Sequence, residues 1–198
     1  MWDAVLEAGK KHNLMVIAPA HHRRIQAGIL SWGQDLDHEH NPFQCNLGYQ
    51  VSLSGKGEWE KKGDYIGKQA LEKMKADLKD GHKPYKLQLV GFEIGGKPID
   101  EYAPDFWLVS PGDGGDPCGF ITSPWYHPEK GKNIAMGYIP FDGTLNPNGF
   151  PKWELGKKFK VHLPDIYADE PGVPVDAVTV DVPFTESFNA NTREVVKG

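Results

Sequence analysis

The chain has 198 residues, of which 39% are hydrophobic, 11% aromatic and 25% charged, values typical of a globular protein and not of a disordered or fibrous one. Its 22 basic and 27 acidic residues are interspersed and give a net charge of −5, which argues against nucleic acid as a partner, because phosphate binding needs a concentrated basic surface. The longest apolar stretch, residues 14–20, is far shorter than the ~20 residues that cross a bilayer, so we expect a cytoplasmic protein with no membrane contact.

The N-terminal part of the chain is predicted to begin with a helix. Trp2, Val5 and Leu6 share one helical face by their spacing. Asn13 is suited to end this helix in a left-handed conformation. A short strand is expected next, over residues 14–18.

Two further helices are predicted before residue 80. One spans residues 23–31 and is expected to end at Gly33, because Ile25, Ile29 and Trp32 repeat at helical spacing. The other is expected to start at Asp64 as N-cap and to end before Gly81. Its apolar face consists of Ile66, Ala70, Met74 and Leu78.

After Pro84 the hydrophobic pattern changes to alternation, which is typical of β-strands. The alternating runs lie at residues 87–92, 134–138, 159–163 and 178–182. Turn-forming clusters rich in Gly, Pro, Asn and Asp separate them at residues 110–117 and 146–149. The second half is therefore predicted to be an antiparallel barrel or sandwich, with a domain boundary between Lys79 and Pro84.

Several classes of chemistry lack their sequence signature. The sequence has no phosphate-binding loop, no dinucleotide-binding glycine motif, no Cys-x-x-Cys and no nucleophile elbow. Asp35 to His40 contains carboxylates and imidazoles, but a polar run between helices is usually solvated, so we expect no metal site there. Asp35 and Asp37 are expected to bond to backbone amides of their turn, and Cys45 to be a small buried apolar residue.

A more specific signal comes from a series of short motifs in a fixed order. The motifs are RIQAG at 24–28, LSWGQD at 30–35, NPFQC at 41–45, YIGKQAL at 65–71, GFITS at 119–123 and IAMGY at 134–138. Their order and spacing resemble the C-terminal half of the folate-dependent aminomethyltransferase family, which includes the T-protein of glycine cleavage. In that family an Arg-x-Glu-Ala-Gly helix leads through an aromatic-Gly turn to a small β-barrel.

Within the family, residues 24–45 look most like the dimethylsulfoniopropionate demethylase branch. That branch has Leu-Ser-Tyr-Gly-Asn-Asp and Asn-Pro-Phe-Glu-Cys at the corresponding places. Here Trp32 stands in place of Tyr, and Gln26 and Gln44 stand in place of Glu. These departures leave open whether the donor carries a methyl or an aminomethyl group.

The resemblance implies an α+β fold. Residues 1–82 would be the C-terminal part of an aminomethyltransferase-like α/β folate-binding region, and residues 83–198 the small antiparallel β-barrel domain. Family members are about twice as long, so we expect this chain to be a C-terminal fragment of a longer enzyme, incomplete in its cofactor pocket and inactive by itself.

The resemblance also suggests binding residues, each with a simpler alternative. Arg24 and Tyr126 would contact the cofactor, tetrahydrofolate. The simpler alternatives are that Arg24 is a surface arginine and that Tyr126 packs in a proline-flanked barrel loop at 122–128. Trp32 would offer its ring to a sulfonium or ammonium group of the donor, or would pack in the core. No catalytic residue is identified.

We therefore expect a tetrahydrofolate-dependent one-carbon transferase acting on a small-molecule donor, with a homo-oligomer or the absent N-terminal half as partner. Such chemistry depends on positioning and charge stabilisation rather than on a covalent intermediate. The alternative is a non-catalytic β-barrel module that holds partner proteins.

Overall fold

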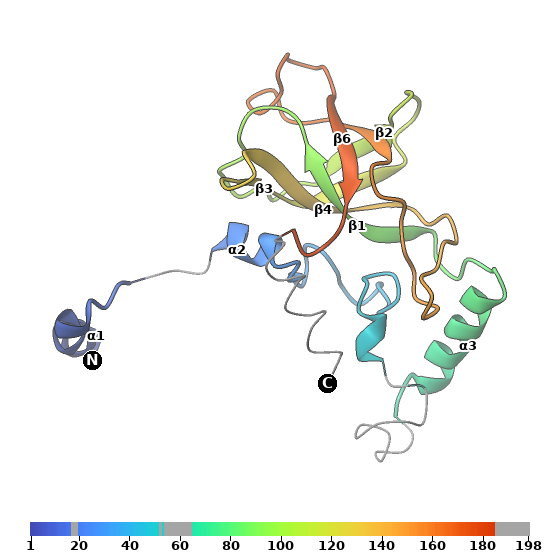
Figure 1. The fold of residues 1–198 in the computed structure, drawn as a ribbon, viewed down its shortest axis with the longest axis horizontal. Helices are drawn as coiled ribbons and strands as arrows, with labels where there is room; N and C mark the ends of the chain where they lie inside the picture. The colour runs from blue at the N-terminus through green and yellow to red at the C-terminus, as the bar shows by residue number, and fades with distance from the viewer. Residues whose placement is uncertain (17–19, 52, 54–64, 185–198) are drawn as a thin grey trace.

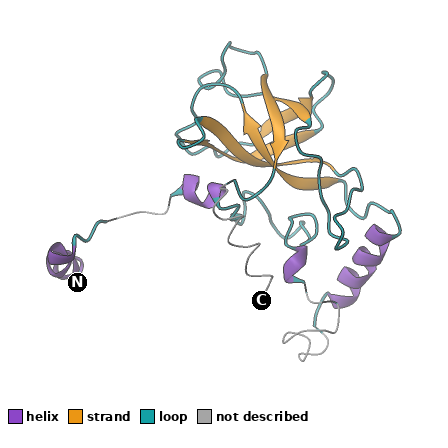
Figure 2. Ribbon diagram, viewed as in Figure 1, coloured by secondary structure: helices purple, strands orange, loops and turns teal. Residues whose placement is uncertain are grey.

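The computed structural model describes residues 1–16, 20–51, 53 and 65–184, and its second half is a closed antiparallel barrel (Figures 1 and 2). Around the barrel the strands follow the order β1-β4-β3-β2-β5-β6. They are β1 (Leu87–Ile94), β2 (Trp107–Pro111), β3 (Gly119–His127), β4 (Lys132–Pro140), β5 (Lys158–Val161) and β6 (Val175–Val180). Closure leaves no open sheet edge, so the barrel expectation is confirmed and the sandwich is excluded.

The alternation in β1 and β4 separates two apolar layers. Val90 and Phe92 of β1, with Ala135 of β4, point into the barrel and join its interior core. Leu89 and Met136 point outward and pack with Ile25 of the N-terminal part. Both faces of these strands are therefore buried, which explains why all but the two end residues of β4 are inaccessible.

Among the described residues, three α-helices precede the barrel. α1 (Trp2–Gly9) continues into a 3-10 turn, η1 (Lys10–His12), and ends at Asn13 with φ 53°, as predicted. α2 (His21–Gln26) is shorter than expected. Gly28 (φ 67°) reverses the chain directly after it, so Gly33 lies in a separate turn and does not end this helix.

The third helix, α3 (Lys68–Lys79), starts later than expected. Asp64, its predicted N-cap, lies outside the described residues, and Gly67 precedes the helix with φ 89°. Leu78 is buried as predicted, but Ile66 lies before the helix and is fully exposed, so its assignment to the apolar face is wrong. A second 3-10 turn, η2 (Gly48–Gln50), lies between α2 and α3.

Other local expectations are also corrected. Residues 14–16 form no strand, and residues 17 and 18 lie outside the described part. Ser110 and Pro111 belong to β2, and the segment expected to be a loop at 122–128 runs as β3 up to His127. Pairing with β4 holds β3 extended through Pro124, whereas β2 pairs only with residues 119–121 of β3.

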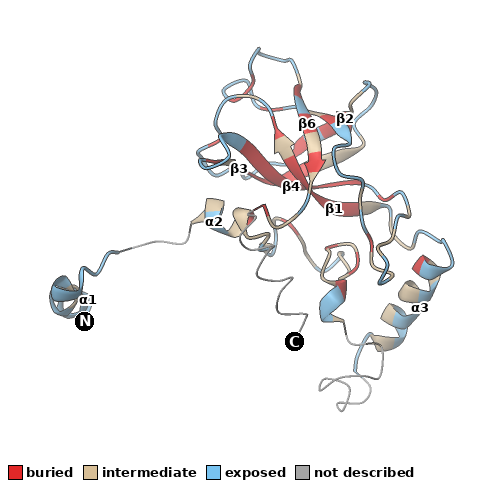
Figure 3. Cartoon of the chain, viewed as in Figure 1, coloured by how far each residue is buried: buried red, intermediate tan, exposed pale blue. Residues whose placement is uncertain are grey.

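The N-terminal part packs on the barrel unevenly (Figure 3). Phe43 and Leu78 form a third apolar cluster with Phe141 from the end of β4. By contrast, α1 has no buried residue and lies away from the barrel in Figure 1. No helix in the described ranges is long and apolar enough to span a membrane.

Candidate functional site

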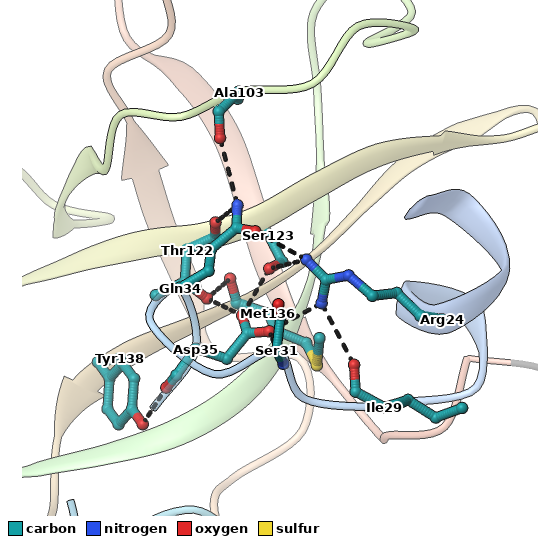
Figure 4. A network of polar contacts seen from close by, with 10 residues as sticks. All are labelled: Arg24, Ile29, Ser31, Gln34, Asp35, Ala103, Thr122, Ser123, Met136 and Tyr138. Carbon is teal, nitrogen blue, oxygen red and sulfur yellow. Dashed lines mark hydrogen bonds and ion pairs between the residues drawn. The ribbon is translucent and has the colours of Figure 1, made fainter. Parts of the chain in front are cut away.

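The described part of the chain contains one extensive buried polar network, centred on Asp35 (Figure 4). The Asp35 side chain has no solvent exposure. Its Oδ2 accepts hydrogen bonds from the backbone N–H of Ser31 and from Arg24 Nη1, both at 2.8 Å. Its Oδ1 accepts the hydroxyls of Thr122 and Ser123, each at 2.5 Å. Four donors thus replace the water that a buried carboxylate loses.

A bulge in β3 brings both hydroxyls to the same carboxylate. Ile121 pairs with Gly137 and Ser123 with Met136, which leaves Thr122 as an extra residue in the strand. Consecutive side chains of a regular strand point to opposite faces, but a bulge redirects one of them. The bulge therefore forms the surface of the barrel that receives Asp35.

Arg24 connects α2 to the same polar network around Asp35. Besides Asp35, its terminal nitrogens donate to the carbonyl of Ile29, to Gln34 Oε1 and to Ser123 Oγ, at 2.9–3.2 Å. All four terminal N–H groups thus have acceptors, and Nε is buried without one. The contact expected between Arg24 and tetrahydrofolate stays a prediction. What the structure shows is an internal clamp between helix, turn and barrel.

Gln34 and Tyr138 complete the network. Gln34 Nε2 donates to the carbonyls of Thr122 at 2.8 Å and Ala103 at 3.2 Å, which links the turn to the β1–β2 connection. The Tyr138 hydroxyl donates to the carbonyl of Asp35 at 2.6 Å and lies 3.4 Å from Cys45 Sγ. Burial raises the pKa of the Tyr138 hydroxyl and of the Cys45 thiol, so both stay protonated at neutral pH. Cys45 is buried, as predicted.

The turn at residues 31–36 presents Trp32 to solvent. Gly33 N–H donates to the carbonyl of Leu36, and the N–H of Asp35 donates to the carbonyl of Ser31, both at 2.8 Å. The side chain of Trp32 is 69% exposed. The alternative that Trp32 packs in the core is therefore wrong, and its ring is available to a ligand.

Tyr126 lies near the end of β3, half-buried, and pairs with Asn133 of β4. Its position in a strand fixes its backbone, whose N–H donates to the carbonyl of Ile99 at 2.8 Å. Its contact with tetrahydrofolate stays a prediction.

The acidic and histidine-rich run from Asp35 to His40 divides between separate interactions. Asp35 belongs to the buried network, whereas Asp37 Oδ1 accepts the N–H of Glu39 and lies 2.7 Å from His40 Nδ1. These bonds lower the pKa of Asp37. Both aspartates bond to backbone amides, as predicted. Among the described residues, no three His, Cys, Asp or Glu side chains converge as metal ligands.

Sequence reasoning missed most partners of Asp35. It found no partner for Ser123 and assigned no role to Thr122, Gln34 or Tyr138. The motifs GFITS and IAMGY, which contain three of these residues, were the available signal. They lie far from Asp35 in the sequence, so only the fold shows why they occur together.

This arrangement is a helix and turn locked onto a barrel, and comparisons identify proteins to which the chain is similar. No protein-family model matches the chain. An aminomethyltransferase of Symbiobacterium thermophilum is 31% identical over 71% of this chain and 33% of its own length. One of Halothermothrix orenii is 28% identical over 72% of this chain and 35% of its own. Dimethylsulfoniopropionate demethylase DmdA of Ruegeria pomeroyi is 29% identical over 83% of this chain and 38% of its own length.

A solved structure shows the same fold. The glycine cleavage system aminomethyltransferase T from Bartonella henselae matches with a TM-score of 0.56 and 20% identity, over 82% of this chain and 37% of that one. The fold is thus that of the C-terminal part of a T-protein, an α/β region followed by an antiparallel barrel. The chain is a relative of the aminomethyltransferase family, and it spans about a third of the length of the curated relatives it matches.

Proposed function

We propose that the chain is the barrel-containing part of a tetrahydrofolate-dependent one-carbon transferase, acting on a methyl or aminomethyl donor. The observation that carries this proposal is the similarity, over 71–83% of the chain, to both aminomethyltransferases and a demethylase. In this proposal residues 1–82 belong to the folate-binding region and residues 83–198 form the barrel domain.

The proposal assigns roles that the geometry permits. Trp32 offers its exposed ring to a cationic sulfur or nitrogen of the donor, because an indole face attracts cations more strongly than other aromatic faces. Tyr126, in β3, is proposed to contact tetrahydrofolate. Arg24 is proposed to act at this site chiefly by holding the 31–36 turn, since its terminal N–H groups already have acceptors.

Tetrahydrofolate, when bound, supplies the nitrogen that accepts the one-carbon unit. The residues of this chain then have to orient the donor and hold its charge. A rigid turn suits this task, because reactions of this kind gain rate from positioning. We further propose that the rest of the relatives' length supplies other pocket contacts, so that this chain alone has no transferase activity.

Calorimetric titration of the chain with tetrahydrofolate tests the proposal. We expect saturable binding in the micromolar range. Dimethylsulfoniopropionate is the donor probe, added to the chain saturated with tetrahydrofolate. Absence of saturable tetrahydrofolate binding, both by this chain and by any extended product of its gene, would contradict the proposal and favour a non-catalytic barrel module.

Variants of Trp32 test the donor contact. Trp32→Ala should weaken binding of dimethylsulfoniopropionate by roughly 1 to 2 kcal/mol, about five- to thirtyfold, whereas Trp32→Phe keeps an aromatic face and should lose less. Tetrahydrofolate affinity and the melting temperature should change little, because the side chain is exposed. Equal losses for both ligands, or a large fall in melting temperature, would contradict a donor contact.

A further inference from the structure

We propose that a cavity lined in part by residues 43–49 binds a planar aromatic carboxylate. The cavity has a volume of about 310 Å³ and lies between residues 43–49 and the β4–β5 connection at 146–155. In Figure 1 this connection descends from the barrel toward α3. Cavities that hold small ligands start at ~300 Å³, so a ligand with one or two rings is the appropriate size.

Four aromatic residues line the cavity, and contacts within the fold hold them in place. The rings of Phe43 and Phe150 lie 6.5 Å apart with an interplanar angle of 26°. The indole Nε1 of Trp153 donates to the carbonyl of Val180 at 3.0 Å, which fixes that ring. Tyr49 stands at the rim with most of its surface exposed. Flat aromatic walls favour a flat aromatic ligand, through stacking or edge-to-face contact.

At Gly48 the rings of Phe43 and Phe150 lie very close to the backbone. A Cβ atom at this position would lie 2.8 Å from a ring carbon of Phe43 and 2.8 Å from one of Phe150. Only glycine therefore lets both rings close on this segment. A cavity held in this way loses little entropy when a ligand enters, which favours binding.

The polar groups that lack partners at this cavity are mostly donors. Within the described part of the chain, Lys152 Nζ has no ion pair or hydrogen bond, and the Asn146 side-chain amide N–H groups are also unused. The Asn146 carbonyl oxygen, by contrast, already accepts the N–H groups of Asn148 and Phe150. An ammonium and an amide donor beside aromatic walls suit a carboxylate on a planar ring.

The single acidic side chain at the cavity, Asp181, carries a negative charge that solvent screens. It is exposed, and its Oδ1 already accepts the N–H of Val182 at 3.0 Å. No residue lining the cavity belongs to the Asp35 network, so the proposal is independent of the transferase function proposed above. Its failure and the failure of that function are therefore distinguishable.

Titration with benzoate, followed by calorimetry and by NMR shifts of the Trp153 indole N–H, tests the proposal. We expect saturable binding. Benzamide, which lacks the charge, and cyclohexanecarboxylate, which lacks the flat ring, should each bind roughly tenfold more weakly. Benzoate affinity should be the same with and without saturating tetrahydrofolate.

Two lysine variants locate the site. Lys152→Gln should weaken benzoate binding roughly tenfold, because it removes the charge and leaves the walls intact. Lys79 is an exposed lysine of α3 that does not line the cavity. The Lys79→Gln variant should therefore bind benzoate like the parent chain. No saturable binding, equal effects of the two variants, or competition with tetrahydrofolate would overturn the proposal.

Discussion

At the scale of single residues, His127 at the end of β3 is an exception to the usual pairing of buried polar groups. It is 1% exposed, and neither ring nitrogen has a hydrogen-bond partner. Burial lowers the pKa of its imidazole, an effect that Glu129 partly opposes. The folded protein therefore holds His127 neutral at a pH where an exposed histidine begins to bind a proton.

This burial predicts a pH dependence of stability. Below the ordinary histidine pKa of ~6.5, the unfolded chain binds a proton at residue 127 that the folded chain does not bind. The contribution of His127 to stability is thus fully present above that pH and is lost as the pH falls below it. Urea unfolding between pH 7.5 and 5 should show stability falling once the pH drops below ~6.5, with a contribution from this group of at most ~1.4 kcal/mol per pH unit.

The His127→Gln variant isolates that contribution. Its free energy of unfolding should fall less steeply with decreasing pH than that of the parent chain. His12→Gln is the matched control, because His12 is exposed and has no ion pair among the described residues. Equal slopes for the parent chain and His127→Gln would contradict the prediction.

At the scale of elements, the 31–36 turn and the β3 bulge depend on each other. The turn supplies the Asp35 carboxylate, and the bulge supplies the Thr122 and Ser123 hydroxyls. Arg24 adds a positive charge, and its side chain is only 16% exposed. The exposed position of Trp32 therefore follows from contacts made by its neighbours and not from its own packing.

Substitution of Asp35 should be costly for this reason. Asp35→Asn leaves the Arg24 guanidinium largely buried without its counter-charge, and we expect a loss of about 3–5 kcal/mol in the free energy of unfolding. Urea denaturation measures it.

Two comparisons test the cause of that loss. Asp37→Asn should cost much less than Asp35→Asn, because that side chain is 41% exposed and solvent screens its charge. The double variant Arg24→Gln/Asp35→Asn should cost less than the sum of its single variants, because the two side chains are in contact. Strict additivity would mean that the ion pair is not the cause.

At the scale of the whole molecule, α1 contributes apolar surface without contributing to the core. Trp2 and Val5 of the helix and Met15 after it are exposed. Exposed apolar surface of this kind favours association with another chain.

Removal of residues 1–16 should therefore reduce self-association and leave the thermal stability of the fold nearly unchanged. We expect the melting temperature to change by no more than about 1–2 °C, because α1 has no buried residue. Light scattering should show less self-association for the shortened chain. Ile25→Ala is the contrasting variant, since Ile25 is buried against the barrel and its truncation should cost ~2–5 kcal/mol. A fall of many degrees after removal of 1–16 would contradict this view of α1.

Most of the secondary structure could be predicted from the sequence where one local pattern sufficed. The alternation at residues 87–92 and 134–138 predicted β1 and β4, because a strand between two apolar layers places successive residues on opposite faces. Asn13 and Gly81 marked helix ends, because their conformations are set by the backbone itself. The ordered motifs likewise predicted the family and its barrel.

Tertiary structure alone decided the features that depend on distant partners. The end of α2 is set by the reversal at Gly28, β3 is held extended through Pro124 by β4, and Ile66 packs against none of the described residues. The roles of Arg24 and Ser123 were equally hidden. The two side chains meet across 99 positions of the sequence, and local periodicity carries no information about such a contact. Hydrogen-bond pairing between distant segments is fixed only when the barrel closes and its bulge receives the turn.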